Sequence, residues 1–178
     1  MNSHTKIISG VTQQKGDSIS ENIHSLDEKT FIAYMKAIGF NSEIPLPRTK
    51  QTVETLLYQH ATKFAFTTFA ANFGDEVKLT ATDLTQYMLK NGQGYCFHHN
   101  VSIGAALKQL GFDVTLVAAS IRKSKDSNEV FPLATHVVVI LNLDNKDYLI
   151  DPGWSDGIIK GLPLGQNPDQ THGKYHTV

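Results

Sequence analysis

The order of the periodic patterns constrains the fold of this chain more than any other feature of the sequence. Up to Gly111 the apolar residues recur at the three- and four-residue spacing of amphipathic helices. Beyond Gly111 the segments 114–121, 135–143 and 148–151 are rich in Val, Ile and Leu, which is typical of strands. Helical and strand patterns do not alternate, so βαβ units and a parallel sheet are not expected. We therefore expect an α+β fold, in which an N-terminal helical bundle precedes a small antiparallel β-barrel or sheet.

The helical part of the pattern is divided by turn signals. The first helix is expected to begin near Ser25, because Ser25 and Glu28 have the spacing of a capping box, and to end at Gly39. Further helices are expected over residues 51–62, 80–91 and 96–110. Residues 1–24 are polar and predict a flexible tail. The expected units are the tail (1–24), a helical domain that carries a candidate nucleophile (25–111) and a β-barrel domain (112–178).

The composition excludes several classes of function. The 178 residues suffice for one compact domain. Sixteen Lys and Arg against seventeen Asp and Glu give a net charge of −1, which leaves no basic field for nucleic acid. No apolar run reaches the ~18 residues of a membrane helix, and residues 1–22 lack the apolar stretch of a secretory signal. A single cysteine cannot form an internal disulfide, so a cytoplasmic protein without nucleic-acid or membrane partners is expected.

That cysteine, Cys96, stands where the fourth helix is expected to begin. Gly92 and Gly94 precede it and allow a tight turn into the helix. The unpaired N–H groups and the positive end of the helix dipole favour a thiolate there, and the same groups can hold a developing oxyanion. Position alone also allows the common alternative, in which a lone cysteine is a small buried apolar residue.

His136 and Asp151 lie at the ends of two expected strands. His136 opens one apolar run and Asp151 closes the next. If a two-residue turn at Asp144 and Asn145 joins the strands, His136 lies diagonally opposite Asp151 on the same face. A three-residue loop would instead place the two on opposite faces. Taken separately, His136 can be a satisfied core residue and Asp151 a turn residue.

Together, Cys96, His136 and Asp151 supply a thiol, a base and an orienting carboxylate, in a cysteine-proteinase-like Cys-His-Asp arrangement. Nucleophilic catalysis requires these parts, because the imidazole takes the thiol proton and the carboxylate fixes its tautomer. These three residues are therefore the candidate catalytic site.

Several motifs around these residues resemble the arylamine N-acetyltransferase family. They are Gly94-Tyr95-Cys96-Phe97-x-x-Asn100, Thr135-His136 at the start of an apolar strand, and Tyr148-Leu149-Ile150-Asp151-Pro152-Gly153-Trp154. The later Pro163-Leu164 pair and the pattern Gln170, Gly173, Tyr175 are also similar to the family. The resemblance extends from about residue 25 to the C-terminus, and its specificity comes from the combination of motifs.

The resemblance implies acetyl transfer from acetyl-CoA to an arylamine, an arylhydrazine or an N-hydroxyarylamine, by a ping-pong mechanism through an acetyl-cysteine intermediate. It implies Cys96 as the nucleophile, His136 as the base and Asp151 as the orienting carboxylate. It also implies that Phe66 and Trp154 line the pocket for the aromatic acceptor, although both are equally compatible with ordinary core positions. Coenzyme A and a small aromatic amine or hydrazine are the expected partners, and no metal is expected.

Beside the candidate nucleophile the chain departs from the family pattern. The family usually has Arg four residues before the cysteine and Glu two residues after it, where this sequence has Gly92 and His98. The Pro-Phe-Glu-Asn segment of the family is here Ala65-Phe66-Thr67-Thr68. The arginine and the glutamate of the family's polar network are therefore both absent. Their joint absence favours replacement of the whole network, because the loss of one partner alone would leave a costly unpaired buried charge. Support for the Cys96 loop must come from elsewhere, and His98 and His99 are candidates unless they are merely solvated.

The C-terminal part differs from the family as well. Family members continue into a further α/β domain after the barrel, whereas this sequence ends at Val178. In the family, coenzyme A lies between the barrel and that domain. The resemblance therefore implies a complete triad beside an incomplete donor site, and an uncovered barrel surface favours self-association or a partner.

Other classes of protein remain open. Transglutaminase-like cysteine hydrolases and deamidases share the Cys-His-Asp order on a similar fold, and a catalytically degenerate binding module would keep the fold alone. A zinc site is the least favoured alternative. His98 and His99 follow Cys96 closely, and His172 and His176 have i, i+4 spacing, but no supporting carboxylate motif accompanies them.

Overall fold

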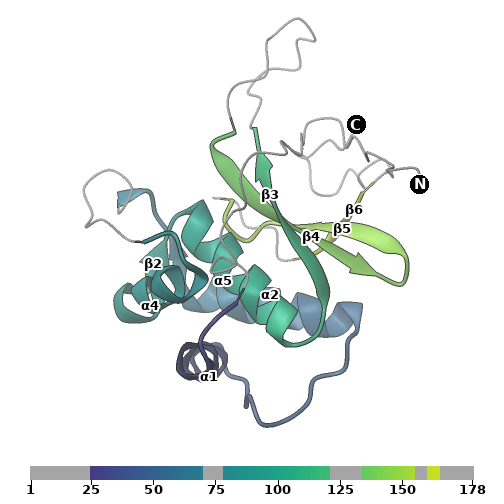
Figure 1. The fold of residues 1–178 in the computed structure, drawn as a ribbon, viewed down its shortest axis with the longest axis horizontal. Coiled ribbons are helices and arrows are strands. Elements are labelled where there is room, and N and C mark those ends of the chain that lie inside the picture. Colours follow the sequence, from purple (N-terminus) through teal and green to yellow (C-terminus); the bar gives the residue numbers. More distant parts are fainter. Residues whose placement is uncertain (1–24, 70–77, 121–133, 155–159, 165–178) are drawn as a thin grey trace, which may run out of the picture.

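Helices and an antiparallel sheet form two parts of one body, as expected for an α+β chain (Figure 1). The computed structural model describes residues 25–69, 78–120, 134–154 and 160–164. The predicted tail over residues 1–24 lies outside this range. No helix in the described segments combines the length and the apolar character that a bilayer crossing requires.

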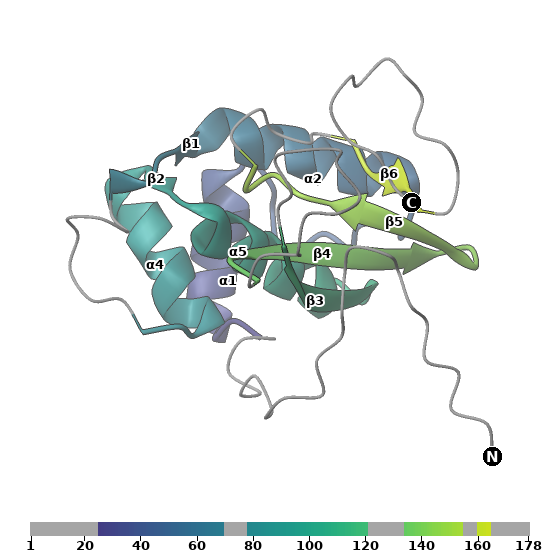
Figure 2. The ribbon, with the colours of Figure 1, turned by 90° about the horizontal axis from the view of Figure 1, so that it is seen from above.

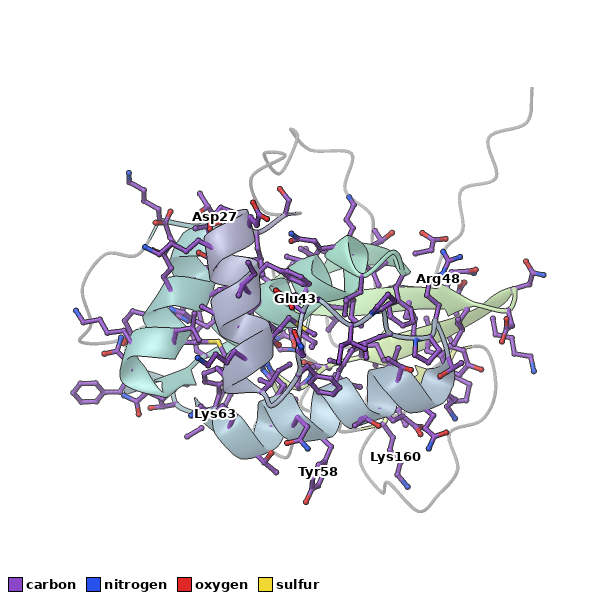
Figure 3. All side chains as sticks on the ribbon, turned by 90° about the horizontal axis from the view of Figure 1, so that it is seen from below. Asp27, Glu43, Arg48, Tyr58, Lys63 and Lys160 are labelled. Carbon is purple, nitrogen blue, oxygen red and sulfur yellow. The ribbon has the colours of Figure 1, made fainter. Side chains whose placement is uncertain are left out.

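The described helices are close to the predicted ones, and polar N-caps define where they begin. Their bounds are α1 Glu28–Ala37, α2 Lys50–Lys63, α4 Ala81–Asn91 and α5 Cys96–Gln109. The predicted capping box of Ser25 and Glu28 is wrong. Asp27 is the N-cap of α1, and its carboxylate accepts from the backbone N–H of Thr30 at 2.7 Å. Aspartate is as good an N-cap as serine, and Glu28 becomes the first helical residue. Figure 3 labels Asp27 at this end of α1.

Helix α4 begins and ends close to the predicted range of 80–91. The hydroxyl of Thr80 accepts from the backbone N–H of Asp83 at 3.1 Å. At the other end Gly92 has a φ of 69°, a left-handed conformation that glycine adopts without strain. The chain therefore leaves α4 sharply and returns toward the start of α5.

Helix α5 is the centre of the molecule. Every residue from His98 to Leu107 is buried. One side of the helix packs against α4 and another against the sheet strands β3 (Asp113–Ala119) and β4 (His136–Leu143) (Figure 2). One apolar core includes residues of the helices and of the sheet. The division into domains at 25–111 and 112–178 stays a prediction.

The sheet has four antiparallel strands in the order β3-β4-β5-β6, where β5 is Lys146–Ile150 and β6 is Leu162–Pro163. Asp144 and Asn145 form the β4–β5 turn with φ values of 53° and 59°, as a two-residue hairpin of type I′ requires. Leu143 pairs with Lys146, so the predicted register is confirmed. Among the described residues β3 and β6 are the two edges of the sheet, so the barrel stays a prediction.

A second, very short sheet joins two helix ends. Strand β1 (Ala65–Phe66) follows α2, strand β2 (Gln93–Gly94) precedes α5, and the two pair in parallel. Ala65 donates to the carbonyl of Gly92 at 2.9 Å, and Thr67 donates to that of Gly94 at 2.8 Å. This pair was not predicted. It fixes the backbone immediately before Cys96.

Candidate active site

Cys96 is the first residue of α5 and is half-buried. Strand β2 delivers the chain to it, and the segment after Asp151 lies against it from the other side. A Cβ atom added at Gly153 would lie 2.8 Å from the Cα atom of Cys96. Only glycine permits this approach of the two backbones, which holds the start of α5 close to the end of β5.

His136 and Asp151 meet as the predicted register requires. His136 is the first residue of β4, and Asp151 directly follows β5. Nε2 of the imidazole lies 2.8 Å from Oδ2 of the carboxylate. The residues are 5% and 4% exposed, so their interaction is shielded from water.

The imidazole of His136 also lies within electrostatic reach of the side chain of Cys96. Because Nε2 binds Asp151, Nδ1 remains for the sulfur. Burial of the ring acts to lower the pKa of His136, but the hydrogen bond with Asp151 and the charges of Asp151 and Cys96 outweigh it and raise the pKa to about 9. The structure thus brings the three predicted residues together, with the imidazole between the sulfur and the carboxylate.

Asn100, one turn along α5 from Cys96, ties these elements to one another. Its side-chain amide nitrogen donates to Oδ1 of Asp151 and to the backbone carbonyl of Val137, both at 2.6 Å. Its amide oxygen accepts from the backbone N–H of Gly153 at 2.9 Å. Asn100 therefore orients the carboxylate from the side opposite to His136.

The two aromatic residues of the predicted acceptor pocket occupy different surroundings. Trp154 meets the His136 ring edge-on, with 5.7 Å between ring centroids. Phe66 lies in β1, is 36% exposed, and has its ring 6.1 Å from that of His99. Trp154 thus borders the candidate base, while Phe66 lies on the short sheet next to the Cys96 loop.

His98 and His99 are both buried, so neither is a solvated surface residue. Nε2 of His99 lies 3.1 Å from the carbonyl oxygen of Gly94 and 3.3 Å from that of Ala65. The ring of His98 packs against Tyr95, whose backbone N–H donates to Nδ1 of His98 at 3.4 Å. Within the described residues Nε2 of His98 has no hydrogen-bond partner, and burial lowers the pKa of this ring to about 4. The structure therefore supports the Cys96 loop with neutral imidazoles.

Within the described segments no arrangement of side chains supports the zinc alternative. No group of three or more His, Cys, Asp and Glu side chains in residues 25–69, 78–120, 134–154 and 160–164 is arranged to hold a metal ion. His172 and His176 lie outside the described residues.

Two residues that organise the site were not assigned a role from the sequence. Asn100 was noted only as part of a motif. His60 was not noted, although its position signals burial, because it continues the apolar stripe of Val53, Leu56 and Leu57 along α2. A histidine on such a stripe needs a partner inside the protein.

Comparisons with known proteins agree with this geometry. The profile of an N-acetyltransferase family matches residues 49–178. Arylamine N-acetyltransferase 2 of Mus musculus is 26% identical over 136 residues, which are 74% of this chain and 45% of the mouse protein.

The fold is also shared with solved structures. The arylamine N-acetyltransferase of Salmonella typhimurium superposes with a TM-score of 0.68 at 23% identity, over 81% of this chain and 51% of that protein. An arylamine N-acetyltransferase of Bacillus cereus gives a TM-score of 0.63 at 20% identity, over 75% of this chain and 53% of that protein. The chain thus spans about half the length of the relatives that it matches. Because the family profile covers most of the sequence and the fold agrees, the chain belongs to the arylamine N-acetyltransferase family.

Proposed function

We propose that this protein transfers an acetyl group from acetyl-CoA to an aromatic amine or hydrazine through an acetylated Cys96. The observation that carries the proposal is the position of His136, which forms a hydrogen bond with Asp151 and interacts electrostatically with Cys96. A thiol, a base and an orienting carboxylate in this order are the parts of a covalent acyl-transfer site. The Bacillus cereus relative is described by a Cys-His-Glu catalytic triad, which likewise ends in a carboxylate.

In the first half-reaction His136 holds the proton of the thiol while the sulfur of Cys96 attacks the carbonyl carbon of the acetyl thioester. The new carbon–sulfur bond forms as the carbonyl oxygen gains negative charge. The first N–H groups of α5 have no carbonyl partner within the helix and can stabilise that oxygen. The bond to the coenzyme A sulfur then breaks, and this sulfur takes the proton from His136. Acetyl-Cys96 and free coenzyme A result.

In the second half-reaction the nitrogen of the amine attacks the acetyl carbon of acetyl-Cys96. His136 takes a proton from the attacking nitrogen, and the bond between carbon and the Cys96 sulfur breaks. The sulfur is then reprotonated by His136, which restores the starting enzyme. Trp154 borders His136 at 5.7 Å between ring centroids, so an aromatic acceptor that packs against its face would bring its nitrogen near the base. Phe66 would line a second side of the pocket for the aromatic acceptor.

Asp151 and Asn100 act on this chemistry through His136. The carboxylate stabilises the imidazolium and fixes which ring nitrogen faces the sulfur. Asn100 holds the carboxylate in turn. We place the reaction in the cytoplasm, because the chain contains a single cysteine that must stay reduced to act as a nucleophile.

Intact mass spectrometry after incubation with acetyl-CoA tests the proposal. The wild-type chain is expected to gain about 42 Da, the mass of one acetyl group that replaces a thiol hydrogen. Addition of aromatic amines and hydrazines should remove this mass and release the N-acetylated amine. Cys96→Ser should gain no mass while its circular dichroism spectrum stays that of the wild type.

The same experiment separates the alternatives. A transglutaminase-like deamidase would show no acetyl adduct but would release ammonia from glutamine peptides. A degenerate binding module would show neither reaction, and its Cys96 would react with iodoacetamide at the rate of an ordinary thiol. Either result in a folded wild-type chain would contradict the proposal.

A further inference from the structure

Three buried side chains from three helices form a hydrogen-bonded series that ends at the loop before Cys96. The hydroxyl of Tyr34 on α1 lies 2.7 Å from Nδ1 of His60 on α2. Nε2 of His60 lies 2.9 Å from Nδ1 of His99 on α5. Nε2 of His99 then reaches the carbonyl oxygens of Gly94 and Ala65. The three side chains are at most 1% exposed.

The chemistry of the partners fixes the direction of every bond in this series. A carbonyl oxygen only accepts, so Nε2 of His99 must carry the hydrogen. In the neutral ring Nδ1 is then an acceptor, and it takes the hydrogen on Nε2 of His60. Nδ1 of His60 accepts in turn from the hydroxyl of Tyr34. One arrangement of tautomers thus satisfies every polar atom of the series.

All three groups are neutral in this arrangement. Burial, reinforced by the neighbouring His99, lowers the pKa of His60 well below its usual value. Burial also lowers the pKa of His99, and it raises the pKa of the Tyr34 hydroxyl. Phe64 packs against two members of the series, with its ring stacked on Tyr34 and tilted against His60. A neutral, dry and close-packed series holds its geometry without placing a further charge beside Cys96.

The end of the series lies at the short sheet that aligns the nucleophile. The carbonyl of Gly94 receives the side chain of His99 as well as the backbone N–H of Thr67. Cys96 follows Gly94 by two residues. The side chain of His99 therefore holds both strands of the β1–β2 pair through their carbonyl oxygens.

We propose that Tyr34, His60 and His99 are positioning residues for Cys96 and set the reactivity of its sulfur toward acyl donors. The inference rests on the proposed function, since it assigns the series a role in the same acyl transfer. None of the three needs to touch the substrate. A break in the series would release the carbonyl of Gly94, let the first turn of α5 shift, and move Cys96 relative to His136.

The test compares variants that break the series with one that breaks a similar bond elsewhere. His99→Phe keeps a ring of similar size but removes the donor, whereas His99→Gln keeps an amide N–H for the carbonyl of Gly94. Tyr34→Phe removes only the hydroxyl. Thr85→Val is the control, because it removes another buried hydroxyl, bonded at 2.7 Å to Ser102 between α4 and α5. Circular dichroism and thermal melting establish that each variant folds.

Two rates are measured for each variant: acetylation of Cys96 by acetyl-CoA and alkylation of Cys96 by iodoacetamide. His99→Phe is expected to slow both by between about tenfold and about 100-fold, the cost of a small misplacement of the reacting atoms. His99→Gln should stay within about threefold of the wild type, because the donor is retained. Thr85→Val should melt earlier but react at the wild-type rate.

Nitrogen NMR of the histidine rings provides a second readout that a merely structural role would not move. His60 and His99 are expected as neutral rings with the hydrogen on Nε2. His99→Phe should release His60 into a mixture of tautomers, because it removes the acceptor for that hydrogen, whereas Tyr34→Phe should leave the tautomer of His60 unchanged. A hydrogen on Nδ1 of His99 would overturn the inference, as would wild-type rates in His99→Phe.

The two proposals fail in distinguishable ways. The wild type could fail to be acetylated while its alkylation still slows in His99→Phe and not in Thr85→Val. This result would reject acetyl-CoA as the acyl donor and retain the positioning role. Normal acetylation in both His99→Phe and the wild type would retain the proposed function and reject the positioning role.

Discussion

Asn100 and Asp151, which lie 51 positions apart in the chain, share a buried hydrogen bond of 2.6 Å. The bond uses Oδ1 of the carboxylate, while Oδ2 holds His136. The carboxylate is therefore held from both sides. Because the same amide also binds Val137 and Gly153, Asn100 joins α5 to both sides of the β4–β5 hairpin.

Replacement of Asn100 should separate the helix from the hairpin. We expect Asn100→Leu to lose between about 2 and about 4 kcal/mol of unfolding free energy, because it leaves buried partners of the amide unpaired. Acetylation of Cys96 should slow by at least about tenfold, since the carboxylate loses one of its two supports. Urea unfolding and intact-mass kinetics measure the two effects.

Asn142→Leu is the matched control for this change. It breaks an Asn–Asp bond of similar length, 2.7 Å to Asp147, on the same hairpin but away from the site. It should destabilise the protein less and leave acetylation at the wild-type rate. Equal loss of acetylation in both variants would show that Asn100 acts only through general stability.

Replacement of Asp151 by Asn should remove most of the activity and retain the fold. The new amide must turn its oxygen toward the donor of Asn100, which directs its nitrogen toward His136. His136 would then have to accept a hydrogen at Nε2, and the imidazolium, which carries a hydrogen on both nitrogens, would lose the carboxylate that stabilises it. By analogy with serine triads, the rate of acyl transfer should fall by about 10⁴. Single-turnover acetylation measures it, and a wild-type rate would reduce Asp151 to a turn residue.

The protonation of His136 should depend on pH in a defined direction. Its pKa is raised to about 9 from the usual 6.5 of histidine, so the folded protein binds the proton more tightly than the unfolded chain. The stabilisation from this proton is fully present below pH about 6.5 and is lost as the pH rises to about 9, by no more than about 3 kcal/mol. Ring-carbon NMR should give a midpoint near pH 9 for His136.

Asp151→Asn supplies the control for this titration, because it removes a carboxylate that raises the pKa of His136. The midpoint should move to lower pH, and the decline in unfolding free energy between pH 6.5 and pH 9 should become shallower. A midpoint that does not move would mean that Asp151 does not hold the proton on His136.

A methyl group at position 153 should disturb the site directly. In Gly153→Ala the new Cβ would lie 2.7 Å from the amide nitrogen of Asn100 and 2.8 Å from Cα of Cys96. We expect the free energy of unfolding to fall by between about 1 and about 3 kcal/mol and the acetylation of Cys96 to slow markedly. Gly161→Ala is the control, because its Cβ would meet the flexible end of Ile150 at 3.1 Å, away from Cys96. Normal acetylation in Gly153→Ala would show that the backbones can separate without consequence.

The arrangement of His136 and Asp151 could be predicted because local chemistry determined it. Asp144 and Asn145 both tolerate a left-handed backbone, and a two-residue turn sets the register of its hairpin. The register then placed His136 and Asp151 on the same face. The start of α5 at Cys96 was likewise set by the turn signal at Gly92 and Gly94.

Other features could not be derived from local patterns. Strands β1 and β2 have two residues each, which is too short for any periodicity to show. The start of α1 was misplaced because Asp27 competes with Ser25 as an N-cap, and tertiary contacts decide between them. The series of Tyr34, His60 and His99 depends on the packing of three helices, and no spacing within one helix reveals it.

The late position of the hairpin in the sequence has a consequence for protein synthesis. The ribosome releases Cys96 well before His136 and Asp151, so a growing polypeptide carries a sulfur without its base or the orienting carboxylate. We expect such a nascent chain to remain unacylated even where the thioester donor is abundant. The first turnover would then occur only once translation has passed Gly153 and the hairpin has docked on α5.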